Sequence, residues 1–166
     1  MTPTPTEIAT FAGPRGAYYA RAWQRLHTPG ATTAGFNGAA FFFNYGWMLY
    51  RRLYDVAAIY GALIVAEAVA SDWYFTHHLH LEDAPRSWDM LVRVIIAVTA
   101  GQFGNMWYLR RAARSIEYAQ RQGTDPSRLG GTSTWAVVVG CAGLFLAGAL
   151  AFTLLGVVGS EGAHAP

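Results

Sequence analysis

The residues of this sequence best suited to metal chemistry are three histidines beside two carboxylates. His77, His78 and His80 are followed by Glu82 and Asp83. Imidazole and carboxylate groups are good ligands for zinc or copper. The spacing does not match an established ligand motif, such as two histidines four positions apart on one helix. We therefore interpret the segment as a solvated polar loop and expect no metal and no cofactor, with a metal-binding loop as the alternative.

Two charged residues, Glu67 and Arg93, interrupt apolar segments, where an ionisable side chain is costly and is a candidate for function. Glu67 lies five positions before Asp72, and Arg93 lies four positions after Asp89. On two antiparallel helices they would share one depth, about 7 Å from the helix ends at ~1.5 Å per residue. We predict a structural ion pair that sets the helix register, because pairing offsets the cost of two isolated charges. The alternative is a proton or ion relay, for which the spans offer few further polar groups.

A second polar group is predicted near the opposite membrane surface. Arg51 and Arg52 precede Asp55 at the spacing of helix neighbours, so we expect them to neutralise its carboxylate. Asn105, and with it Asn37, is expected at the same level. These side chains would form a polar anchor that holds a short helix against the bundle, or each would reach interfacial water on its own.

Other kinds of chemistry lack a signature in this sequence. We find no nucleophile with a supporting base, no phosphate loop and no nucleotide fingerprint, so we expect no enzymatic activity. The net charge is +2, which is too small to indicate a nucleic-acid partner. The single cysteine, Cys141, cannot form a disulfide within one chain.

The elements that carry these residues are predicted to be membrane helices. Hydrophobic residues make up 53% of the chain and charged residues 13%, against about 25% in an ordinary soluble domain. The charges are segregated, and three apolar runs at about 53–73, 88–109 and 134–158 each approach the ~20 residues that a span requires. The fold class is therefore an all-α membrane protein with three transmembrane helices in a domain over 53–158. The second helix is expected to continue beyond the membrane to about Arg121.

Two shorter elements are predicted before the spans. Residues 1–34 form a cytoplasmic tail, flexible over 1–12, with an amphipathic helix from Pro14 to about His27. Its apolar face consists of Tyr19, Ala22, Trp23 and Leu26. The segment 35–52 contains a helix of about 22 Å, shorter than the ~30 Å hydrocarbon core, so we predict an interfacial or re-entrant helix.

Arginine placement predicts the orientation of the chain. The arginines before the first span and in the second loop are Arg15, Arg21, Arg25, Arg51, Arg52, Arg110, Arg111, Arg114, Arg121 and Arg128. The first loop contains only Arg86, and the tail 159–166 has none. The positive-inside rule then puts the N-terminus and second loop in the cytoplasm and the first loop and C-terminus in the periplasm of a bacterial inner (cytoplasmic) membrane.

Small residues mark one face of two of the predicted spans. Gly143, Ala147 and Ala151 recur at every fourth position in the third span, as Ala97 and Gly101 do in the second. Small residues allow helix backbones to approach closely. They predict helix packing, either within the bundle or against another protein.

Two segments carry a resemblance to a known family. The first is FNGAAFFF at 36–43 followed by WMLYRRLY at 47–54, and the second is GQFGNMWYLR at 101–110. Together with Tyr18, Tyr19 and Trp23, they resemble the DUF2628 family of small bacterial inner-membrane proteins of unknown function, over roughly residues 15–120. The family usually has Trp at position 38 and often Gly-Pro at 44–45, where this chain has Gly and Asn-Tyr. The resemblance implies a small helical membrane protein and no particular reaction.

These observations favour a non-catalytic accessory or scaffold subunit of a larger bacterial membrane complex. Its expected partners are the lipid bilayer and other membrane protein subunits, with lipid or pigment contacts and no nucleic acid. One alternative is a small homo-oligomeric transporter or channel that uses Glu67 and Arg93. The other is a metal-binding membrane protein that uses the 77–83 loop.

Overall fold

A computed structural model describes residues 2–81 and 84–162 of the chain, with side chains through Leu154. Its elements are α1 (Pro5–Ala12), η1 (Gly13–Arg15), α2 (Gly16–Leu26), α3 (Gly38–Tyr50), α4 (Tyr54–His77), α5 (Arg86–Gln122), η2 (Pro126–Arg128) and α6 (Thr134–Gly162). These described segments contain no strand, so the predicted all-α class is confirmed.

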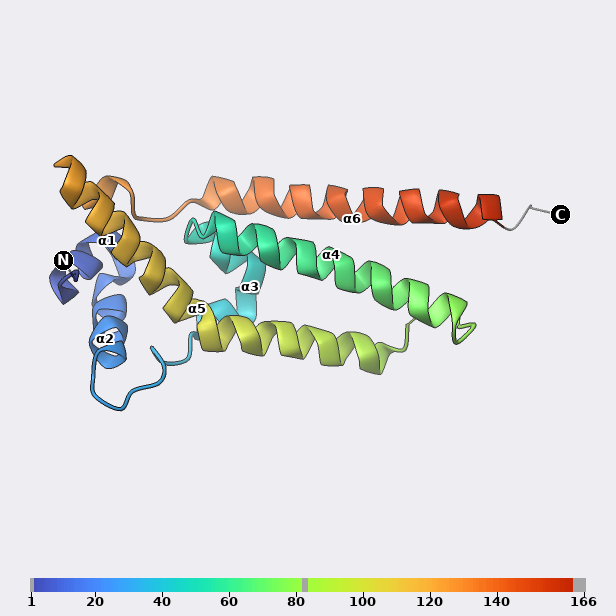
Figure 1. The fold of residues 1–166 in the computed structure, drawn as a ribbon, viewed down its shortest axis with the longest axis horizontal. Coiled ribbons are helices and arrows are strands. Elements are labelled where there is room, and N and C mark those ends of the chain that lie inside the picture. Colours follow the sequence, from blue (N-terminus) through green and yellow to red (C-terminus); the bar gives the residue numbers. More distant parts are fainter. Residues whose placement is uncertain (1, 82–83, 163–166) are drawn as a thin grey trace.

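Three helices, α4, α5 and α6, are long and apolar enough to cross a membrane, as predicted. In Figure 1, α4, α6 and the first part of α5 run side by side. The rest of α5 changes direction and reaches the N-terminal helices, which confirms the predicted extension beyond the span. Gly123 ends α5 in the left-handed conformation (φ 64°), where glycine has no side-chain penalty.

The buried core lies where the N-terminal helices meet the second half of α5. Its fully buried side chains include Ile8, Phe11, Tyr19, Met48, Tyr108, Leu109 and Ile116. The long helices, in contrast, bury little within the chain, and no residue in the most apolar window of α6 is buried. A lipid environment explains this distribution, because apolar side chains have no need to be covered by protein there.

Residues 5–12 form a helix, so the prediction of a flexible tail over 1–12 is wrong. Thr4 and Glu7 form a reciprocal capping box, and Pro5 occupies the first turn. Glu7 also accepts a hydrogen bond of 2.6 Å from Gln120 Nε2 on α5. The predicted amphipathic helix is α2, whose residues Tyr19 and Trp23 are buried against protein.

The short helix α3 enters and leaves at the same end of the bundle. Its backbone is non-helical at Asn44, where two helical pieces meet. Asn37 N–H, before the first piece, donates to Gly101 O of α5 at 2.8 Å, and Arg51 O, after the second, accepts from Arg111 Nη1 at 3.0 Å. Both ends therefore contact α5, while Asn44, where the two pieces meet, lines a cavity.

Candidate functional site

A polar cavity of about 690 Å³ lies between α4, α5 and α6, next to the turn that joins α4 to α5. Its polar lining consists of Asn44, Glu67, Ser71, Asp72, Arg86, Asp89 and Arg93. Ile64, Ile96 and Phe152 contribute an apolar portion. The cavity thus brings together Glu67 and Arg93, the two charged residues that the sequence places inside the apolar segments.

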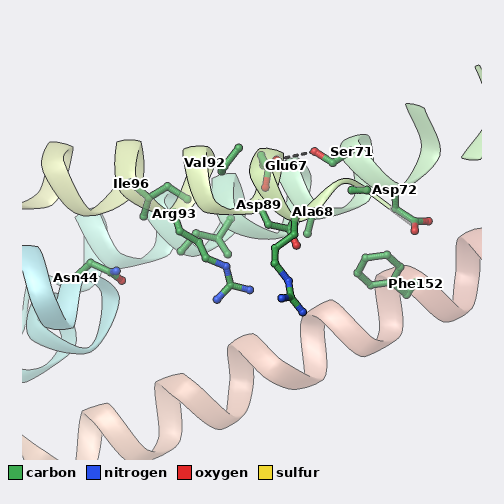
Figure 2. A pocket seen from close by; sticks show the side chains of 13 residues that line it. Asn44, Glu67, Ala68, Ser71, Asp72, Asp89, Val92, Arg93, Ile96 and Phe152 are labelled. Atoms are coloured by element: carbon green, nitrogen blue, oxygen red, sulfur yellow. Dashed lines mark hydrogen bonds between the residues drawn. The ribbon is translucent and has the colours of Figure 1, made fainter. Parts of the chain in front are cut away.

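Glu67 and Arg93 do not form the predicted ion pair within the described part of the chain. Glu67 Oε1 accepts from Ser71 Oγ at 2.6 Å and from Trp88 Nε1 at 3.3 Å. Figure 2 shows Glu67 turned toward Ser71, whereas Arg93 extends toward α6. The predicted contact is not made. The Glu67 carboxylate is bound instead by two neutral donors, Ser71 one turn along α4 and Trp88 on α5.

Trp88 is a site residue that the sequence alone did not identify. Its Nε1 donates to Ser71 Oγ at 2.9 Å as well as to Glu67, and its ring lies 5.9 Å from that of Phe75. In the sequence, Trp88 stands at the start of the second apolar run, where an aromatic residue is expected at the membrane interface. An indole there commonly has one polar contact, and the facing helix α4 offers Ser71 Oγ and Glu67 Oε1 as acceptors.

The inner end of the cavity is formed by the break in α3. Asn44 lines the cavity at the point where its backbone leaves the helical conformation. Irregular backbone is tolerated at membrane depth only where protein covers it or where it lines a cavity. At the break itself, the Tyr45 N–H donates to Asn44 Oδ1.

The predicted polar anchor is divided into separate contacts. Asp55 pairs with Arg114 at 3.7 Å, and both side chains are exposed, so the contribution to stability is small. Arg51 is 2% exposed and donates from Nη1 to Ala12 O at 3.1 Å. Arg52 donates from Nη2 to Thr132 O at 3.4 Å. The prediction that Arg51 and Arg52 neutralise Asp55 is therefore wrong, because α3 and α4 are separate helices with Arg52 in a left-handed turn between them (φ 57°).

Asn105 is the centre of a buried hydrogen-bond network. Its Oδ1 accepts from Asn37 Nδ2 at 2.9 Å, and its Nδ2 donates to Tyr18 Oη at 2.8 Å and to Gly35 O at 2.9 Å. Asn37 Oδ1 in turn caps α3 by accepting from Ala40 N–H at 3.0 Å. The network joins α2, α3 and α5, which is the anchoring role predicted for Asn105, with Asn37 and Tyr18 as its partners.

Comparison with known families identifies the part of the chain that contains most of these residues. The family described as "Protein of unknown function (DUF2628)" matches residues 16–114. The chain belongs to the DUF2628 family. The matched region contains α2, α3, α4 and most of α5, so the Asn105 network and most of the polar cavity lie within it, whereas α6 lies outside. No curated protein and no solved structure matches the chain.

Beyond the DUF2628 match, α6 faces α4 across an apolar groove of about 830 Å³. Its wall on α6 includes the predicted packing residues Gly143, Ala147 and Ala151. Its wall on α4 includes Ala58, Ala62 and Ala66, a second row of small residues at every fourth position that sequence reasoning did not single out. The two rows of small residues face each other, and the groove between them is open.

The other predicted packing face of this DUF2628 protein lies on α5, and α3 packs against it. A Cβ added at Gly101 would lie 3.0 Å from Phe41 Cβ, and one at Gly104 would lie 2.8 Å from Ala40 Cβ. Gly101 and Gly104 therefore let α3 approach α5 closely. Ala97 lines a smaller pocket nearby, beside Phe41.

The histidines do not form a metal site within the residues that the structure describes, where no group of three or more His, Cys, Asp or Glu could hold an ion. The His77 ring stacks on Trp73 with centroids 5.6 Å apart, and His78 contacts Trp73 and Tyr74. The two carboxylates of the predicted loop, at positions 82 and 83, lie outside the described residues.

Proposed function

We propose that this DUF2628 protein is a non-catalytic accessory or scaffold subunit of a larger complex in the bacterial inner membrane. The observation that carries the proposal is the open groove between α4 and α6. The most apolar window of α6 buries no residue within the chain, and Gly143, Ala147 and Ala151 face the alanines of α4 across free space.

The occupant of this groove is proposed to be a transmembrane helix of another subunit. Glycine and alanine on both walls would let a third backbone approach closely, which is the main source of helix association in lipid. The groove lining contains almost no polar surface, so a predominantly apolar helix would fit it. The arginine distribution supports an orientation with the N-terminus and the α5–α6 connection in the cytoplasm.

The glycines of α6 provide a test with a matched control. A Cβ at Gly143, which lines the groove, or at Gly148, which is not part of the lining, would meet no atom within 4 Å. Both positions therefore have open space at the Cβ, and leucine at each adds bulk to the surface beside it. The tagged full-length protein and the variants Gly143→Leu and Gly148→Leu would be purified from native membranes in mild detergent.

We expect the wild type and Gly148→Leu to retain the same membrane protein subunit and Gly143→Leu to lose it. A wild-type chain that always purifies alone would refute the accessory role. Equal retention by both variants would refute the groove as the docking site.

A second candidate, a small transporter or channel, is favoured by the polar cavity. Glu67 and Arg93 line it, and the break at Asn44 forms its inner end. Proteoliposomes loaded with a pH-sensitive dye would report proton flux, which the double variant Glu67→Leu/Arg93→Leu should abolish. Wild-type flux no faster than that of protein-free liposomes would exclude proton transport.

A further inference from the structure

Arg51 is a buried cation without a carboxylate partner in the described part of the chain. Its side chain is 2% exposed, and Nε has no hydrogen-bond partner. The one ion pair among the described residues joins Asp55 to Arg114. Burying an uncompensated charge is costly, so the site would be stabilised by an anion.

Three tyrosine rings surround the Arg51 guanidinium but do not cancel its charge. Its Cζ lies 4.7 Å from the ring centroid of Tyr19, 5.3 Å from that of Tyr108 and 5.7 Å from that of Tyr50. The ring faces attract a cation and remain neutral themselves. Burial raises the pKa of Tyr19, so this phenol stays protonated near neutral pH.

Arg51 lines a pocket of about 380 Å³ whose lining combines cationic and apolar side chains. Arg15 is a second guanidinium in this lining, Asn37 and Tyr18 add polar groups, and no carboxylate is present. Phe43, Trp47 and Val137 contribute apolar surface. A ligand that fits this lining is an amphiphile with a negatively charged head.

The position of the pocket indicates where such an amphiphile would come from. It lies between α2 with the preceding turn η1, which carries Arg15, and the two pieces of α3, with α6 contributing Val137. Phe43 is 70% exposed, so the apolar part of the lining reaches the surface, where a lipid chain could contact it. Arginine suits the head group because its planar fork binds phosphate with two parallel hydrogen bonds.

We propose that this pocket binds an anionic phospholipid from the leaflet on the α2 side, with its phosphate near Arg15 and Arg51 and an acyl chain along Phe43 and Val137. Arg15 donates directly to the phosphate from the exposed side. Arg51 contributes mainly its charge from within the wall, because its Nε is buried. The bound lipid would link α2 to α3 and α6, and this role is independent of the docking groove.

The test compares lipids that share acyl chains and differ in charge. The full-length protein in detergent would be titrated with phosphatidylglycerol, phosphatidylcholine and inorganic phosphate, with thermal unfolding and native mass spectrometry as readouts. Arg15→Gln removes the direct donor without disturbing the core, since Arg15 is exposed. Arg21→Gln is the control, because it removes an arginine that is also exposed, lies on α2 and is not part of the pocket.

We expect phosphatidylglycerol to stabilise the wild type more than phosphatidylcholine does. Arg15→Gln loses one charge-assisted contact, so it should bind phosphatidylglycerol about tenfold more weakly than the wild type does. Arg21→Gln should bind it with the affinity of the wild type. Equal effects of the two lipids, or equal losses in the two variants, would overturn the proposal. The same Arg15-dependent stabilisation by inorganic phosphate alone would show that the ligand is a free anion and not a lipid.

Discussion

Asn105 and Glu67 illustrate how single polar side chains are accommodated in this largely apolar chain. Asn105 is 1% exposed and has partners for both ends of its amide. Glu67 is partly buried and accepts from Ser71 and Trp88. Each is satisfied by neutral donors or acceptors, which avoids the desolvation cost of a buried ion pair.

Replacing Asn105 by alanine should destabilise the protein by about 1–3 kcal/mol, because Asn37 would keep a buried polar atom, and Gly35 a partly buried one, without a partner. Thermal or denaturant unfolding in detergent would measure the change. Gln102→Ala is a suitable control, since Gln102 is exposed and lies one turn away on α5. Equal stability of the two variants would contradict the role of Asn105 as a central partner.

The Glu67 contacts predict the outcome of two double-mutant cycles. Glu67→Gln with Trp88→Phe should show a coupling energy of about 0.5–1.5 kcal/mol, as expected for one hydrogen bond. Glu67→Gln with Arg93→Gln should show less, because these side chains share a cavity without a contact. A larger coupling to Arg93 than to Trp88 would support the ion pair that the sequence predicted.

At the scale of elements, α3 is held by close approach to α5. Gly101 and Gly104 stand opposite Phe41 and Ala40, and the Asn37 N–H bonds directly to the backbone of α5. This contact leaves no room for a side chain on α5. By contrast, α6 meets α4 through an open groove, and a Cβ at Gly143 or Gly148 of α6 would have free space.

Gly104→Ala should therefore destabilise the α3–α5 contact, by about 1–3 kcal/mol for overpacking at 2.8 Å from Ala40 Cβ. Gly148→Ala should have a neutral or slightly stabilising effect, since alanine is favoured over glycine in a helix by about 1 kcal/mol. Unfolding curves in detergent would separate the two. If Gly104→Ala were as stable as Gly148→Ala, the packing of α3 described here would be wrong.

The whole molecule is asymmetric, with a protein core at one end and sparsely packed spans at the other. The N-terminal helices and the α5–α6 connection share the end with the core, and the α4–α5 turn lies at the opposite end (Figure 1). This arrangement brings the arginine-rich segments together, as expected of a cytoplasmic face.

Cysteine labelling tests the proposed orientation. Cys141 would first be replaced by alanine, and single cysteines would then be introduced as His78→Cys and Ser127→Cys, both at exposed positions. A membrane-impermeant maleimide should label position 78 in cells with a permeabilised outer membrane and an intact inner membrane. Position 127 should react only after the inner membrane is opened. The reverse pattern would mean that the topology is inverted.

Much of the architecture follows from composition and periodicity alone. Apolar runs of spanning length fix α4, α5 and α6 regardless of their neighbours, because backbone in lipid must satisfy its own hydrogen bonds. The short α1 was missed although Thr4 and Glu7 carry the signature of a capping box, since eight residues give little periodicity. Family membership was also accessible, because the motifs around 36–54 and 101–110 lie within the matched region.

Composition and residue spacing are enough to predict the spans, the orientation and the residues that need polar partners. The partners themselves emerge from the packed fold: Glu67 is bound by Ser71 and Trp88, Asn105 by Asn37, and Arg51 lies among tyrosines. Span length and hydropathy are local properties. Hydrogen-bond partners depend on rotamers and on the path of α3, which are set when the helices pack.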